Sequence, residues 1–175
     1  LLAMNRLWEL NLGEDQLAEI GLRLGADVPV FVRGHAAFGE GVGEKLTPTN
    51  PPEDWFLVLK PECNISTGKI FSAEGLTRDT PKIKIRPAFE GDASRYRNDC
   101  EDVVRKLYPE VNQSLEWLSQ FGPARLTGTG ACIFGRFPTE SAARIIWESK
   151  PSGITGFVAQ GVNISPLHKK LTELK

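Results

Sequence analysis

The chain contains few of the residues that form disulfides or bind metal ions, with three cysteines and two histidines among 175 residues. Cys63, Cys100 and Cys132 show no C-x-x-C spacing, and neither His35 nor His168 lies at a metal-ligand spacing from a cysteine. An odd number of cysteines without that spacing predicts free thiols in a reducing compartment, where they serve as small buried side chains. We therefore expect a cytoplasmic protein without a structural zinc site.

The sequence also lacks a long apolar run and an excess of charge of one sign. No apolar run approaches the roughly 18 residues that a transmembrane helix requires, and no basic leader of a signal peptide is present. The formal net charge of −1 provides no field that would attract nucleic acid or an anionic membrane. The net charge does not exclude a binding site for a small molecule, because backbone amides bind phosphate without any net charge on the protein.

What is present is typical of a globular protein, with 41% hydrophobic and 25% charged residues. The length suits one ordinary domain, or one small domain plus part of another. The first residues include no start methionine, and Leu1, Leu2, Leu7 and Trp8 resemble the middle of an apolar helix. We therefore expect that the sequence is truncated at its amino end.

A proline-containing segment, residues 47–54, is the candidate boundary between two domains, 1–52 and 53–175. For the last residues of the chain, packing back on the first domain is an alternative to packing within the second. Before the boundary, the pattern predicts a helix over 14–24 that ends at Gly25, a strand over 30–32 and a hairpin over 36–46.

After the boundary, the pattern predicts the order strand, helix, helix, strand, strand, helix, strand. The expected spans are a strand over 55–59, a short helix over 67–71, helices within 98–120 interrupted at Pro109, strands over 124–126 and 131–134, a helix over 140–148, a strand from 156 and a final helix from 166. Residues 77–97 are predicted to be loop or weak helix. This order indicates an α+β domain with helices over a mostly antiparallel, ferredoxin-like sheet.

The first candidate for chemistry is the segment Thr127-Gly128-Thr129-Gly130, which lies between two apolar runs. Glycines around a hydroxyl residue allow the backbone to approach a ligand closely, and its amides and hydroxyls could hold phosphate oxygens. A glycine-rich hairpin turn without a ligand is equally compatible with this spacing.

The second candidate is Asp27. Gly25 ends the preceding helix and Pro29 biases Val28 toward an extended conformation, so we expect a tight helix-to-strand corner that holds the carboxylate rigidly. On the sequence alone, a turn aspartate that bonds nearby amides is the more common role.

Three further groups carry weaker signals. The alternating glycines of residues 39–44 precede no G-K-[ST] and no helix, so a twisted hairpin is favoured over a nucleotide-binding loop. Thr67 and Phe71 lie four apart, and one helical face could present both to a base or sugar, although capping and core packing are the ordinary roles. Acidic residues at 99, 101 and 102 fit the first turn of a helix and are interpreted as structural.

Together these segments resemble one family. The segments 24–31 (LGADVPVF), 40–44 (EGVGE) and 126–132 (LTGTGAC), with the closing 163–168 (NISPLH), are similar in order and spacing to the 4-diphosphocytidyl-2-C-methyl-D-erythritol kinase family of the GHMP superfamily. The resemblance covers nearly the whole chain, as the C-terminal two-thirds of such an enzyme. It implies a GHMP kinase fold, with the remnant of an N-terminal S5-like domain followed by a ferredoxin-like C-terminal domain.

The resemblance also implies an activity and a set of residues. The family uses ATP and Mg²⁺ to phosphorylate the 2-hydroxyl of a cytidine-diphosphate-linked methylerythritol, in the non-mevalonate route to isoprenoids. By position, Asp27 matches the family's catalytic aspartate. The motif beside the triphosphate is matched by Gly128, Thr129 and Gly130. The contacts to cytidine are matched by Thr67 and Phe71. Gly68-Lys69, between the last two, differs from some relatives.

The family's glycine-serine phosphate loop and active-site lysine are expected upstream of Leu1, so this polypeptide alone is predicted to be inactive. Two alternatives stay open on the sequence. One is another GHMP kinase, acting on homoserine or mevalonate, and the other is a non-catalytic ferredoxin-like binding module. No basic stripe or aromatic RNP pattern favours RNA binding.

Overall fold

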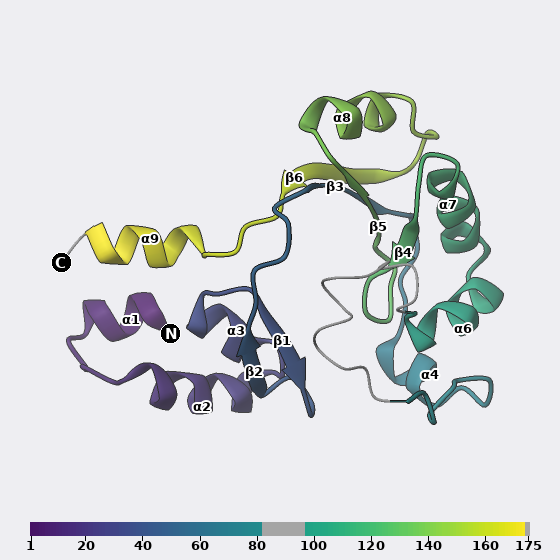
Figure 1. Ribbon diagram of the computed structural model, residues 1–175. Coiled ribbons are helices and arrows are strands. Elements are labelled where there is room, and N and C mark those ends of the chain that lie inside the picture. The colour runs from purple at the N-terminus through teal and green to yellow at the C-terminus, as the bar shows by residue number, and fades with distance from the viewer. Residues whose placement is uncertain (82–96, 174–175) are drawn as a thin grey trace. The chain divides into compact units, whose positions relative to one another are not determined.

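The computed structural model describes residues 1–81 and 97–173, which form two compact units (Figure 1). The first unit comprises Leu1–Glu53 with Val162–Lys175, and the second comprises Asp54–Gly161. The change of unit after Glu53 falls within the segment 47–54. The assignment of 1–52 and 53–175 to the two domains of a kinase stays a prediction, and the loop expected over 77–97 lies mostly outside the described residues.

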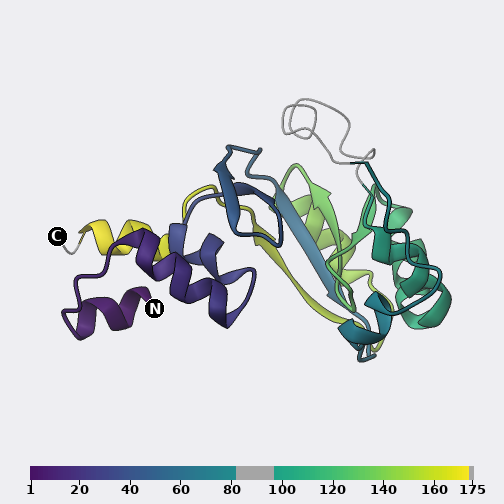
Figure 2. The ribbon, with the colours of Figure 1, turned by 90° about the horizontal axis from the view of Figure 1, so that it is seen from below.

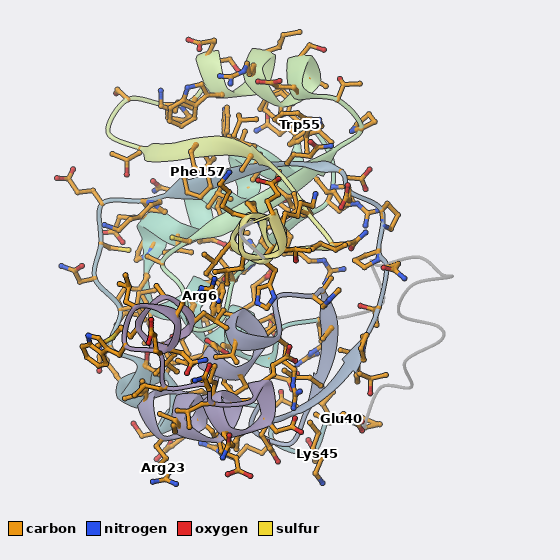
Figure 3. The ribbon with its side chains drawn as sticks, turned by 90° about the vertical axis from the view of Figure 1, so that its left-hand side faces the viewer. Arg6, Arg23, Glu40, Lys45, Trp55 and Phe157 are labelled. Atoms are coloured by element: carbon orange, nitrogen blue, oxygen red, sulfur yellow. The ribbon has the colours of Figure 1, made fainter. Side chains whose placement is uncertain are left out.

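The first unit consists of short helices and one hairpin. Its elements are α1 (Leu2–Leu7), α2 (Glu14–Leu24), α3 (Val28–Arg33), β1 (Ala37–Glu40), β2 (Lys45–Pro48) and α9 (Pro166–Glu173). Helix α2 has the predicted bounds, and β1 pairs with β2 as the predicted hairpin. Glu40 and Lys45 face each other in its register, beside the turn (Figure 3).

The strand predicted over 30–32 is wrong, because this segment is helix α3. Proline is well tolerated in the first turn of a helix, where its missing N–H leaves no hydrogen bond unmade. Pro29 occupies that first turn, and Gly34, at φ +67°, ends the helix in the left-handed conformation. Pro29 therefore marks the start of a helix and not the entry into a strand.

The end of the chain completes the first unit. Ala36 N donates to Asn163 O (2.8 Å) and Ser165 N donates to Gly34 O (2.8 Å). The His168 ring packs against Gly34, where any side chain would collide with it. Helix α9 thereby lies beside α1 and α2 (Figures 1 and 2), and the three helices line a cavity of about 830 Å³.

The second unit has the predicted ferredoxin-like architecture. Its elements are β3 (Trp55–Lys60), α4 (Thr67–Phe71), α6 (Asp99–Leu107), α7 (Pro109–Ser119), β4 (Ala124–Leu126), β5 (Ile133–Phe137), α8 (Glu140–Glu148) and β6 (Thr155–Gln160). The sheet order is β4-β5-β3-β6, and every neighbouring pair is antiparallel. Helices cover one face of this sheet, and Leu57, Leu59 and Ile133 point into the core that they share.

The local signals in the sequence explain these boundaries. Pro109 separates α6 from α7 as predicted, and Thr139 caps α8 by accepting a hydrogen bond from Ala142 N (3.2 Å). Ser66 rather than Thr67 caps α4, with its Oγ 3.4 Å from Lys69 N. Among the described residues, no helix reaches the length and apolarity that a membrane span needs.

Candidate functional site

The loop 127–130 connects the edge strand β4 to β5. Thr127 N donates to Cys132 O (3.0 Å) and Gly130 N donates to Thr127 O (2.9 Å), which closes the turn. Gly128 and Gly130 adopt φ values of +53° and +89°, a region that side chains disfavour. The two glycines are therefore required by the backbone of the turn.

The two glycines face different surroundings. A Cβ at Gly130 would lie 2.8 Å from Ile65 Cδ1 and 3.1 Å from Leu126 Cδ1, so Gly130 lies against packed side chains. A Cβ at Gly128 would meet no atom within 4 Å. One side of the loop is thus packed on the unit, and the other is open to a ligand.

The loop contains backbone amides that make no hydrogen bond within the described residues. Within the described part of the chain, the backbone amides of Gly128 and Thr129 donate to no other group. Successive free amides in a glycine turn form a concavity suited to an anion. The loop therefore has backbone donors of the kind that bind a phosphate.

The structure brings Thr67 to this loop. Thr67 Oγ1 lies 3.0 Å from Thr129 Oγ1, and the hydrogen bond joins the first turn of α4 to the glycine loop. Phe71, one turn further along α4, has 57% of its surface exposed, so the core-packing role is wrong for it. Thr67, predicted near cytidine, and Thr129, predicted near phosphate, therefore lie side by side in the second unit.

Asp27 lies in the first unit, in the turn between α2 and α3. The expected helix-to-strand corner is wrong, because the chain passes from helix to helix at this point. Asp27 is the exposed N-cap residue of α3, and among the described residues its carboxylate accepts no hydrogen bond. The common role of a turn aspartate, bonding nearby amides, is therefore not the one found.

Sequence reasoning missed Asn98. Its Oδ1 caps α6 by accepting from Cys100 N (3.0 Å), while its Nδ2 donates to Leu126 O (3.1 Å) and Gly128 O (2.6 Å). The only available signal was the choice of asparagine at a helix start, since its amide combines an acceptor with two N–H donors, whereas a serine hydroxyl has one donor and a carboxylate has none. Acidic residues 99, 101 and 102 do occupy the first turn of α6, as predicted.

The hairpin turn 41–44 shows no open anion site. Val42 N donates to Glu44 Oε2 (2.7 Å), so the turn binds a carboxylate of its own. Hydrogen bonds from the amides of Glu44 itself and of Val42 hold the pKa of the Glu44 carboxyl below its ordinary value. This arrangement agrees with the prediction of a twisted hairpin.

Two other features bear on the chemistry. The cavity in the first unit is lined by α1, α2 and α9, including Asn5, Glu14 and His168, and by none of the predicted site residues. Among the described residues, no group of three or more His, Cys, Asp or Glu side chains is arranged to hold a metal ion.

Comparison with known proteins agrees with the fold and with the resemblance. The family described as "GHMP kinases C terminal" matches residues 84–149. A protein of Marinobacter nauticus named 4-diphosphocytidyl-2-C-methyl-D-erythritol kinase is 98% identical over all of this chain and 61% of its own length. A protein of the same name from Pseudomonas syringae pv. syringae is 57% identical over 98% of this chain and 60% of its own.

Solved structures give the same result. The crystal structure of a 4-(cytidine 5'-diphospho)-2C-methyl-D-erythritol kinase superposes with a TM-score of 0.75 at 25% identity, over 91% of this chain and 60% of the other. A homoserine kinase from Cytophaga hutchinsonii, at 14% identity and a TM-score of 0.62, covers 93% and 62% and shares the fold. The chain thus spans about three-fifths of the length of the relatives it matches.

Proposed function

We propose that the chain is part of a GHMP kinase, and that a protein as long as its relatives transfers a phosphoryl group from ATP to the 2-hydroxyl of 4-diphosphocytidyl-2-C-methyl-D-erythritol. The observation that carries this proposal is the 98% identity, over the whole chain, to the Marinobacter nauticus protein of that name. The geometry of the glycine loop supports it independently.

The loop 127–130 is proposed to hold phosphate oxygens. The free amides of Gly128 and Thr129 supply donors on its open side, and Gly130 keeps the turn against the packed side chains. When bound, ATP supplies the transferred phosphoryl group, and Mg²⁺ neutralises charge on its oxygens. Mg²⁺ commonly binds through substrate phosphates and only one or two carboxylates, so this proposal requires no cluster of acidic side chains.

Thr67 and Phe71 are proposed to contact the cytidine part of the substrate. The exposed Phe71 ring offers a face on which a base stacks, and the first turn of α4 places Thr67 at the glycine loop. The hydrogen bond between Thr67 and Thr129 would then couple the positions of the two substrates.

Asp27 is proposed to orient the hydroxyl that attacks. Its carboxylate is exposed and makes no hydrogen bond within the described residues, so it is available to accept one from an alcohol. A carboxylate is too weak a base to deprotonate an alcohol fully in the ground state. In phosphoryl transfer through a loose transition state, the proton leaves late and the carboxylate chiefly positions the oxygen.

The cysteines support the proposed cytoplasmic location. All three are free, and burial raises the pKa of the Cys63 and Cys100 thiols. Protonated, partly shielded thiols behave as small apolar side chains in a reducing compartment.

Asp27→Asn tests the proposal in the Marinobacter nauticus kinase. We expect turnover, measured as ADP release, to fall by roughly 10²–10⁴-fold, because the substitution removes the charged acceptor but keeps its shape. Unchanged turnover would remove Asp27 from the mechanism. In the same assay the unsubstituted enzyme should prefer diphosphocytidyl-methylerythritol to homoserine and mevalonate, and a preference for either of the latter contradicts the proposed substrate.

A further inference from the structure

We propose that Asn98 is a positioning residue that aims the free amide of Thr129 at the ligand of the glycine loop. The proposal rests on the phosphate-binding role proposed above. Asn98 is half-buried at the start of α6, and its side-chain amide joins that helix to two carbonyl groups of the loop region.

The direction of the Thr129 amide follows from peptide geometry. In a trans peptide the carbonyl oxygen and the next amide hydrogen point in opposite directions. The peptide between Gly128 and Thr129 is not among the cis bonds of the described residues. Since Asn98 Nδ2 holds Gly128 O at 2.6 Å, the Thr129 N–H is directed away from Asn98 and toward the open side of the loop.

The start of α6 also provides hydrogen-bond partners for the backbone of the edge strand β4. Strand β4 is an edge strand, so the outward backbone groups of Leu126 have no neighbouring strand. Leu126 N donates to Glu101 Oε2 (3.0 Å), and Leu126 O accepts from Asn98. Glu101 is in turn held by Arg105, whose Nε lies 3.1 Å from Glu101 Oε1. The start of α6 therefore replaces a strand partner and fixes the strand that leads into the loop.

The asparagine amide combines an acceptor for the α6 cap with two N–H donors for the carbonyls of Leu126 and Gly128. Serine and aspartate both keep an acceptor for the cap, but a serine hydroxyl is one bond shorter and has a single hydrogen, and a carboxylate has none. Asn98→Ser removes the amide donors without adding charge, whereas Asn98→Asp has nearly the same shape and places a carboxylate oxygen against two carbonyls. Thr139→Ala is the matched control, because it weakens a helix cap of the same unit that has no contact with the loop.

Hydrogen exchange in the 175-residue chain gives the first readout. We expect Asn98→Ser to accelerate exchange of the Gly130 amide by roughly tenfold to thirtyfold, since two hydrogen bonds are lost, while exchange within α6 and α7 is unchanged. Asn98→Asp should accelerate it further, and Thr139→Ala should not affect it. Unchanged exchange at Gly130, or equal acceleration throughout α6, would overturn the positioning role.

The second readout is the kinetics of the Marinobacter nauticus kinase carrying the same substitutions. We expect Asn98→Ser to raise the KM for ATP several-fold, with a smaller change in the KM for the alcohol substrate. If the enzyme is active and Asn98→Ser accelerates exchange at Gly130 but leaves the KM for ATP unchanged, the inference is overturned. If the unsubstituted protein proves not to be a kinase, while exchange at Gly130 still responds, the proposed function fails and the loop-positioning role of Asn98 survives.

Discussion

Two glycine turns of similar composition lie in different units of this molecule, and they differ in what their amides bind. The turn 41–44 places its own Glu44 carboxylate on the Val42 amide. The turn 127–130 leaves the amides of Gly128 and Thr129 without a partner among the described residues, and it is held from outside by Asn98. One turn therefore satisfies its own donors, and the other keeps them for a ligand.

The difference shows that glycine spacing alone does not identify an anion site. Both turns contain two glycines at positive φ, so the backbone requirement is the same in each. What differs is the side chain that lies against the turn, an acceptor in one case and a donor in the other. An acceptor occupies amides and repels phosphate, whereas a donor binds carbonyls and leaves amides free.

Titration with inorganic triphosphate tests this difference most directly. In the 175-residue chain we expect the NMR signals of the Gly128 and Thr129 amides to shift with a Kd on the order of 1 mM, about 4 kcal/mol of binding free energy. The amides of Val42 and Gly43 should not shift, and serve as the internal control. Shifts of equal size in both turns, or in the hairpin alone, would contradict the comparison.

Alanine substitutions at Gly128 and Gly130 compare the open side of the loop 127–130 with its packed side. Gly130→Ala should lower the free energy of unfolding of the second unit by about 2–4 kcal/mol, because strain at positive φ adds to a collision with Ile65. Gly128→Ala has only the backbone strain, about 1–2 kcal/mol. Denaturant unfolding followed by circular dichroism measures both, and equal losses would show that Gly128 is packed as well.

The hydroxyl pair at the loop is expected to contribute less. Thr67→Val and Thr129→Val each remove one member of the pair, and a double-mutant cycle on the free energy of unfolding isolates their interaction. We expect a coupling of about 0.5–1 kcal/mol, since the bond is exposed to water. Thr139→Val, paired with Thr67→Val, should show no coupling. A zero coupling between Thr67 and Thr129 would remove the link between the two predicted contacts.

Much of the second unit could be predicted from the sequence because its signals are local. Pro109 and the cap at Thr139 lie within a few residues of the boundaries that they set, and the alternation of strand and helix indicated the sheet. The strand predicted over 30–32 was wrong because a proline such as Pro29 is compatible both with the start of a strand and with the first turn of a helix. A single proline does not distinguish these two environments.

The arrangement of the candidate site was less accessible to sequence reasoning. The glycine loop and Thr67 were each identified, but their contact joins residues 62 positions apart. Asn98 was missed because its bonds to the loop span 28 and 30 positions. Local pattern gives the elements and their turns, whereas the pairing of a helix start with a distant loop depends on how the elements pack.

The smallest expected effect concerns the carboxylate that fills the hairpin turn. Hydrogen bonds from the Glu44 and Val42 amides lower the pKa of Glu44, so its ionised form favours the folded turn. A lowered folded-state pKa gives stabilisation that is present above the ordinary glutamate pKa of about 4.3 and is lost as the pH falls through the folded value. The Val42 amide signal, followed against pH, should therefore titrate with a midpoint below the ordinary glutamate pKa. Glu44→Gln should abolish that titration while keeping an oxygen that accepts from Val42. A midpoint at or above the ordinary value would mean that the turn amides are as available as those of the loop 127–130.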